Sequence, residues 1–272
     1  MIEIPILQTL THPFNQVLDR PDNEILQKIN PKEGQSGKSL SEIIQGMGVL
    51  PSLTAVLGTA LDGLPLLLEL KNPRPGALLI TGDPLSGKTA LLKSIFTSLV
   101  TNGLPSEVQF SLISAKPAQW QKEIIAYRPF IRGHASNYEL QAVELIYDLC
   151  NLVESRQSGK LTGGAQLLLF DGLETLPYMD QAVVENFLWL LEYGPKQSVW
   201  PIATLNRAAA IAHERLRCAF HTHLIGAIHN LEDGWRIAAS NRLNTTQLQD
   251  GHEFAVRMGG GWLKFTLPNQ LN

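Results

Sequence analysis

TGDPLSGKTALLKSIFTSL, residues 81–99, joins the end of an apolar run to the start of an amphipathic one. Within it, Gly82 to Thr89 has the pattern G-x-x-x-x-G-K-T, which is typical of a phosphate-binding loop. The apolar run at 76–82 predicts a buried strand before the loop, and the periodicity of 88–100 predicts a helix after it. Strand, loop and helix in this order are the context that the motif requires.

Such a loop binds phosphate through its backbone. Its glycines let successive N–H groups point at one phosphate, and the N-terminus of the following helix adds a favourable dipole. Lys88 is expected to contact the β- and γ-phosphates, and the Thr89 hydroxyl to bind Mg²⁺. We therefore expect ATP and Mg²⁺ as cofactors. The expected cofactor-binding residues are Gly82, Asp83, Pro84, Leu85, Ser86, Gly87, Lys88, Thr89 and Ala90.

A second metal ligand is expected at the end of a neighbouring strand. In QLLLFDGLETL (166–176), Asp171 directly follows four apolar residues, the position of the acidic residue that holds Mg²⁺ in such sites. The alternative is an ordinary strand-end carboxylate that caps a turn. Because a phosphate-binding loop precedes it, the sequence favours Thr89 and Asp171 as the metal ligands.

The rest of the chain alternates between strand and helix patterns. Strands are predicted at 108–114, 166–170 and 199–206, helices at 39–53, 138–157 and 179–194, a hairpin at 55–70, and short strands at 223–228, 252–258 and 262–267. The segment 117–133 is interpreted as an amphipathic helix with basic outer residues, in preference to a nucleic-acid contact. This alternation predicts an α/β fold with a mostly parallel sheet flanked by helices, to which the C-terminal strands add antiparallel edge strands.

Composition limits the class of protein. The chain has 272 residues, of which 44% are apolar and 17% charged, as in a folded domain. We expect an N-terminal appendage and linker at 1–50 and one ATP-binding domain at 51–272. No apolar run is long enough for a membrane span and no signal peptide is recognisable, so a cytoplasmic protein is expected. The net charge of −3 argues against a protein that binds nucleic acid over its whole surface, since such proteins are usually basic.

From the hairpin onward the sequence resembles the FtsK/HerA group of RecA-like P-loop motor ATPases, especially FtsK/SpoIIIE DNA pumps and type VII secretion ATPases. The similar segments are the run 55–89, VQFSLISAKP (108–117), QLLLFDGLETL, VWPIATLNRA (199–208) and the C-terminal hairpin. The resemblance implies a RecA-like P-loop NTPase that assembles as a homo-oligomer, with a hexameric ring as one form. It also implies ATP as a partner and leaves both DNA and a polypeptide open as the transported substrate.

The sequence departs from this family at groups that accelerate hydrolysis. Gly172 stands where the family has the glutamate that orients the attacking water, and Glu174 is the nearest replacement. We therefore interpret Lys88, Asp171 and Glu174 as the catalytic set and expect weakened hydrolysis. The change Gly172→Glu is expected to raise turnover, provided that the backbone there does not need a positive φ. The alternative is a hydrolysis-poor scaffold or regulatory subunit of a secretion or DNA-processing assembly.

Two further family positions are also altered. The polar sensor position falls on Leu205, between Thr204 and Asn206, and either neighbour is a candidate replacement. The position of an arginine that acts across a subunit interface falls on His223. The candidate substitutes for that arginine are Arg207, Arg215 and Arg217, although basic residues on a helix face are more often solvated.

Overall fold

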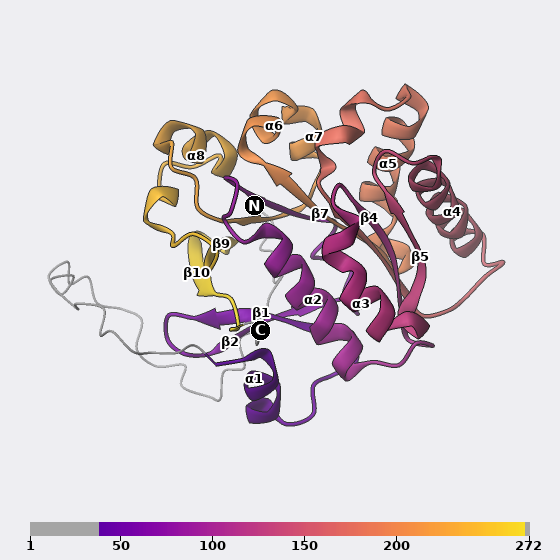
Figure 1. Ribbon diagram of the computed structural model, residues 1–272, viewed down its shortest axis with the longest axis horizontal. Helices are drawn as coiled ribbons and strands as arrows, with labels where there is room; N and C mark the ends of the chain where they lie inside the picture. Colours follow the sequence, from indigo (N-terminus) through magenta and orange to yellow (C-terminus); the bar gives the residue numbers. More distant parts are fainter. Residues whose placement is uncertain (1–37, 270–272) are drawn as a thin grey trace, which may run out of the picture.

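One ten-stranded sheet runs through the molecule (Figure 1). The computed structural model describes residues 38–269, so most of the expected appendage at 1–50, with its linker, lies outside the described residues. The strand order is β2-β1-β10-β9-β8-β3-β7-β6-β4-β5. The strands are β1 (Thr54–Ala60), β2 (Pro65–Glu69), β3 (Leu78–Gly82), β4 (Val108–Ser114), β5 (Ile131–Ser136), β6 (Ala165–Asp171), β7 (Val199–Asn206), β8 (Thr222–Ile225), β9 (Glu253–Met258) and β10 (Gly261–Thr266).

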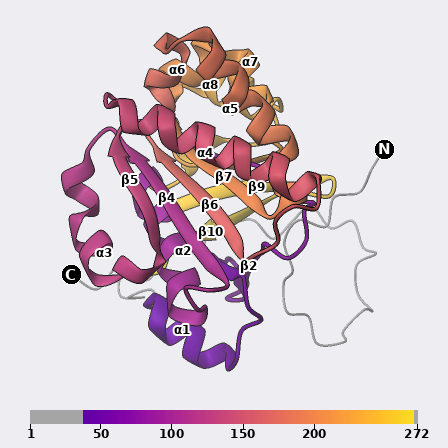
Figure 2. The ribbon, with the colours of Figure 1, turned by 90° about the vertical axis from the view of Figure 1, so that its right-hand side faces the viewer.

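Strands β8, β3, β7, β6, β4 and β5 are parallel, and helices cover both faces of the sheet (Figure 2). One face packs against α2 and α3, and the other against α4 and α5, with α6 to α8 beside them. This arrangement confirms the predicted α/β fold. The helices are α1 (Leu40–Met47), α2 (Lys88–Asn102), α3 (Gln121–Ala126), α4 (Leu140–Gln157), α5 (Gln181–Tyr193), α6 (Arg207–Ala212), α7 (Glu214–Cys218) and α8 (Leu231–Ala238).

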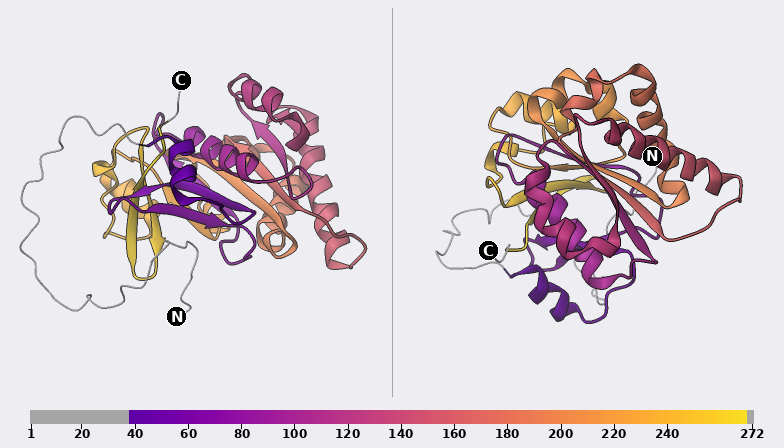
Figure 3. Two further views of the ribbon diagram at one scale, coloured as in Figure 1. Left: turned by 90° about the horizontal axis from the view of Figure 1, so that it is seen from below. Right: turned by 45° about the vertical axis from the view of Figure 1, so that its right-hand side comes forward.

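Antiparallel strands form one edge of the sheet, as predicted, but in a different order. The outermost strands are those of the β1–β2 hairpin, and β10 and β9 lie between this hairpin and the parallel strands (Figure 3). Strand β8 belongs to the parallel part, since it pairs with β3. Gly58 permits the close approach of β1 to β10, because a Cβ there would lie 2.2 Å from the Thr266 carbonyl oxygen.

The predicted helix at 117–133 is wrong in part. Helix α3 covers only six residues of it, between short 3₁₀ turns at Pro117–Trp120 and Arg128–Phe130, and the segment ends in strand β5. Pro129 explains the interruption, since proline lacks the N–H that a continuing helix needs. No helix among residues 38–269 has the length and apolarity needed to cross a membrane.

His223 on β8 predicts a pH dependence of stability. Burial, and secondarily the Arg217 charge, lowers the pKa of its imidazole to about 4, while Nε2 donates to the Phe220 carbonyl oxygen at 3.2 Å. The imidazole of the unfolded chain takes up its proton near pH 6.5. Above this pH neither state is protonated, so the free energy of unfolding is expected to be at its highest and independent of this group. It should fall by at most about 3 kcal/mol as the pH drops towards 4.

Urea denaturation at several pH values measures this loss. His223→Gln keeps a donor for Phe220 but has no proton to take up, so its stability should depend less on pH. The exposed neighbour provides the control: His221→Gln should retain the dependence of the parent. Equal slopes in the parent and in His223→Gln would refute the assignment.

Candidate functional site

The predicted phosphate-binding loop joins β3 to α2. Gly87 precedes the helix with a left-handed backbone (φ 90°), and Lys88 is the first residue of α2. The Lys88 ammonium donates to the carbonyl oxygens of Gly82 at 3.1 Å and Asp83 at 2.7 Å. Burial lowers the pKa of Lys88, and the carboxylates of Glu174, Asp83 and Asp171 oppose this shift. The Lys88 ammonium is therefore held at the loop by two backbone carbonyl oxygens.

The two expected metal ligands meet, although they are far apart in the sequence. The Thr89 hydroxyl donates to both carboxylate oxygens of Asp171, at 3.0 and 3.1 Å. Asp171 is the last residue of β6, and β6 and β3 both pair with β7. A hydroxyl and a carboxylate are hard oxygen donors of the kind that Mg²⁺ prefers, so the residues present fit this ion.

Two more side chains bind the Asp171 carboxylate. The Thr204 hydroxyl donates to Oδ1 at 2.8 Å, and the Trp120 indole N–H donates to Oδ2 at 3.0 Å. Thr204 also accepts the Gly172 N–H at 2.8 Å. Of the two candidate sensor residues, Thr204 is thus the one at the carboxylate, whereas the Asn206 side chain caps α6 through Ala209 N at 2.9 Å. Sequence reasoning missed Trp120, because its contact depends on how the chain returns after β4.

Glu174 lies in the 3₁₀ turn Leu173–Tyr178, three residues after Asp171. Its Oε1 accepts the backbone N–H of Asn206 at 2.7 Å. Its carboxylate and that of Asp171 line a cavity of about 590 Å³ at the carboxyl ends of β3, β4, β6 and β7. The residues lining it are Pro84, Leu85, Gly87, Lys88, Thr89, Ala90, Ala115, Lys116, Gln119, Asp171, Gly172, Glu174, Thr204 and Asn206.

The loop is also held from the side of β8. The Asp83 carboxylate accepts from Arg207 Nε at 2.7 Å and from the His229 backbone N–H at 2.8 Å, and Arg207 pairs in addition with Asp233. Arg217 is buried and donates to backbone carbonyl oxygens of α6 and α8, so it is not a solvated residue. In this structure, two of the three candidate substitutes for the family's arginine therefore have partners within the chain.

Gly172 does not meet the condition for restoring a glutamate. Its φ is 98°, a left-handed conformation that L side chains rarely adopt, and a Cβ there would lie 2.9 Å from the Ala115 Cβ. Gly172→Glu is therefore expected to lower the free energy of unfolding by about 1–3 kcal/mol without raising turnover. Urea denaturation and a phosphate-release assay measure the two effects.

Gly63 offers a matched control for this change. It also has a positive φ (83°), but it lies in an exposed hairpin turn where a Cβ would meet no atom within 4 Å. Gly63→Glu should thus show the backbone cost alone, and Gly172→Glu combined with Ala115→Gly should recover part of the lost stability. Faster hydrolysis in a fully stable Gly172→Glu variant would refute this expectation.

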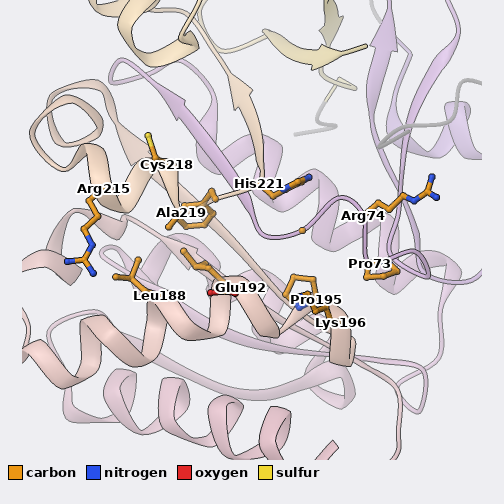
Figure 4. A pocket seen from close by; sticks show the side chains of 13 residues that line it. Pro73, Arg74, Leu188, Glu192, Pro195, Lys196, Arg215, Cys218, Ala219 and His221 are labelled. Atoms are coloured by element: carbon orange, nitrogen blue, oxygen red, sulfur yellow. The ribbon is translucent and has the colours of Figure 1, made fainter. Parts of the chain in front are cut away.

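A larger cavity, of about 930 Å³, lies at the amino ends of β3, β7 and β8 (Figure 4). Apolar side chains make up much of its wall, with the basic side chains of Arg74, Lys196 and Arg215 around them and Glu192 as the acidic one. The phosphate-binding loop and both expected metal ligands line the smaller cavity instead. The expected nucleotide-binding residues therefore lie at the smaller of these two cavities.

Comparisons with known proteins bear on the family and the fold of the chain. The model of the FtsK/SpoIIIE family matches residues 50–158. The structure of Thermomonospora curvata EccC (ATPases 2 and 3) in complex with a signal sequence peptide aligns with a TM-score of 0.65 at 17% identity, covering 82% of this chain and 42% of that one. EssC (ATPases 2 and 3) from Geobacillus thermodenitrificans aligns with a TM-score of 0.66 at 11% identity, covering 83% and 47%.

A third solved structure is that of the pCW3 conjugation coupling protein TcpA, monomer form with ATPγS. It aligns with a TM-score of 0.62 at 13% identity, covering 80% of this chain and 66% of that one. No curated protein sequence matches the chain. At these identities the solved structures establish a shared fold, and the chain spans less than half of the EccC and EssC chains.

Proposed function

From the premise that this chain is a P-loop ATPase domain of the FtsK/SpoIIIE type, we propose that it binds ATP with Mg²⁺ at residues 82–90 and hydrolyses ATP slowly. One observation carries the proposal: Lys88 and Thr89 at the start of α2 converge with Asp171 at the end of β6 in a single cavity. Titration with ATP in MgCl₂, followed by a phosphate-release assay, tests both parts.

Each residue has a proposed role. Lys88 binds the β- and γ-phosphates, and Thr89 and Asp171 hold Mg²⁺, which when bound neutralises phosphate charge. Glu174 is the proposed acceptor for the proton of the attacking water, through Oε2, because Oε1 already binds Asn206 N. Hydrolysis is slow in this proposal because Gly172 supplies no carboxylate next to Asp171.

Assembly and transport are also part of the proposal. We infer a homo-oligomer, of which a hexameric ring is one form, formed by a domain at 51–272 with an appendage at 1–50. DNA and a polypeptide both remain candidates for the moved substrate, since solved structures of this fold include a conjugation coupling protein and a complex with a signal sequence peptide. Light scattering with and without ATP tests self-association, and phosphate release with and without DNA tests stimulation by DNA.

The second candidate function is a nucleotide-binding scaffold or regulatory subunit. Gly172 is the specific observation that favours it, because its backbone conformation excludes a simple return of the glutamate. The two functions predict different kinetics. A slow ATPase turns over repeatedly, whereas a scaffold binds ATP and releases phosphate no faster than free ATP does under the same conditions.

A further inference from the structure

We infer that Trp120 is a positioning residue for Asp171, and that Mg²⁺ bound with nucleotide is coupled through its indole to the segment 116–126. The inference rests on the proposed function, since it assigns a residue that holds the metal ligand. Trp120 is 1% exposed, and its Nε1–H donates to Asp171 Oδ2 at 3.0 Å. Because an indole N–H can only donate, it needs an acceptor oxygen at Oδ2 and so helps to fix the orientation of the carboxylate.

Three side chains donate hydrogen bonds to the Asp171 carboxylate, and one of them, Thr89, is also a proposed metal ligand. The Thr89 hydroxyl is therefore not committed to Asp171 once a cation is bound. Thr204 and Trp120 remain, with Thr204 on Oδ1 and Trp120 on Oδ2. Each carboxylate oxygen thus has one donor from outside the phosphate-binding loop, and loss of either donor should let the carboxylate turn.

Trp120 is held by helix α2, the helix that follows the phosphate-binding loop. The Lys93 ammonium lies 5.3 Å from the centroid of the Trp120 ring and pairs with Glu123 of α3 at 2.8 Å. Phe96 packs edge-on against the same ring, with centroids 6.2 Å apart. Lys116 and Gln119, just before Trp120, line the nucleotide cavity. The segment 116–126 therefore contacts both the cavity and the metal ligand.

Packing alone does not account for the polar contact of Trp120. Trp200 on β7 is equally buried at 1% exposure, yet its Nε1 has no hydrogen-bond partner among residues 38–269. This fold therefore tolerates a buried tryptophan without an acceptor. The pair offers a matched comparison, since Trp→Phe removes one indole at either position but a hydrogen bond to the carboxylate only at Trp120.

The test is a titration of ATPγS into the full chain at a series of MgCl₂ concentrations and in EDTA. Trp120→Phe is expected to raise the Mg²⁺ concentration for half-maximal binding by about tenfold, the loss of one charge-assisted hydrogen bond. The affinity in EDTA should stay unchanged, and Trp200→Phe should behave as the parent does. Identical Mg²⁺ dependence in both variants would overturn the inference, whereas failure of the parent to bind ATPγS would overturn the proposed function instead.

A spectroscopic measurement covers the case in which Trp120→Phe does not fold. The chain has five tryptophans, so 5-fluorotryptophan gives five ¹⁹F resonances, which single Trp→Phe variants assign directly or by elimination. Adding MgCl₂ to the parent with ATPγS should shift the Trp120 resonance and leave that of Trp200 in place. A Trp120 resonance that does not respond to Mg²⁺, in a parent that binds ATPγS, would refute the coupling.

Discussion

Replacing Lys88 with alanine is expected to weaken ATP binding by about 10²-fold or more. Lys88 is the lysine of the predicted phosphate-binding loop, and each charge-assisted hydrogen bond that its ammonium is proposed to make to a phosphate would contribute about 1.5–3 kcal/mol. Two such bonds, one to each of the terminal phosphates, give the expected loss. Isothermal titration with ATP in MgCl₂ measures it directly.

Two controls separate binding from folding. Lys122→Ala removes the same charge from an exposed position on α3, so it should bind ATP as the parent does. Thermal unfolding without nucleotide shows whether Lys88→Ala remains folded, because the lysine also bonds to two carbonyl oxygens of its own loop. Equal ATP affinity in the parent and in a folded Lys88→Ala variant would refute the assignment of the site.

Glu174→Gln is expected to slow ATP turnover by about 10²–10⁴-fold, the usual contribution of a positioned general base. Glutamine keeps an oxygen that accepts the Asn206 N–H, so the turn should keep its shape while the base is lost. ATP affinity should therefore change little. Steady-state phosphate release together with isothermal titration measures both quantities.

Glu192 provides the comparison for this change, since Glu192→Gln alters an exposed carboxylate on α5, at the cavity by the amino ends of β3, β7 and β8. Its turnover should equal that of the parent. Equal rates of ATP hydrolysis in the parent and in Glu174→Gln would show that this carboxylate is not the base. A parent with no turnover above that of free ATP would instead support the scaffold function.

Much of the fold could be predicted because its signals are local. Strand β3, the loop and α2 follow from one continuous motif, and β4 and β7 have the predicted bounds, since short apolar runs between helical patterns are typical of buried parallel strands. The position of β10 between β1 and β9 could not be predicted, because it depends on pairing between distant segments.

Only part of the candidate site could be predicted from the sequence. Lys88, Thr89 and Asp171 could be selected as site residues because each lies in a recognisable loop or strand-end pattern. The contact of Trp120 with Asp171 and the backbone conformation of Gly172 are not, since both depend on how 115–120 packs beside the end of β6. A glycine in a sequence does not reveal the sign of its φ.

The pairing of β1 with β10 has a consequence for the order of events during translation. Strand β1 leaves the ribosome long before β10, and until β10 is made the inner edge of the β1–β2 hairpin has no partner strand. Unpaired strand edges with apolar side chains promote misassembly in nascent chains. The parallel strands β3 to β8, which carry the proposed nucleotide cavity, pair among themselves and can form earlier. Completion of the antiparallel edge is thus the late step, and a chaperone would protect the nascent chain most effectively by covering the waiting hairpin.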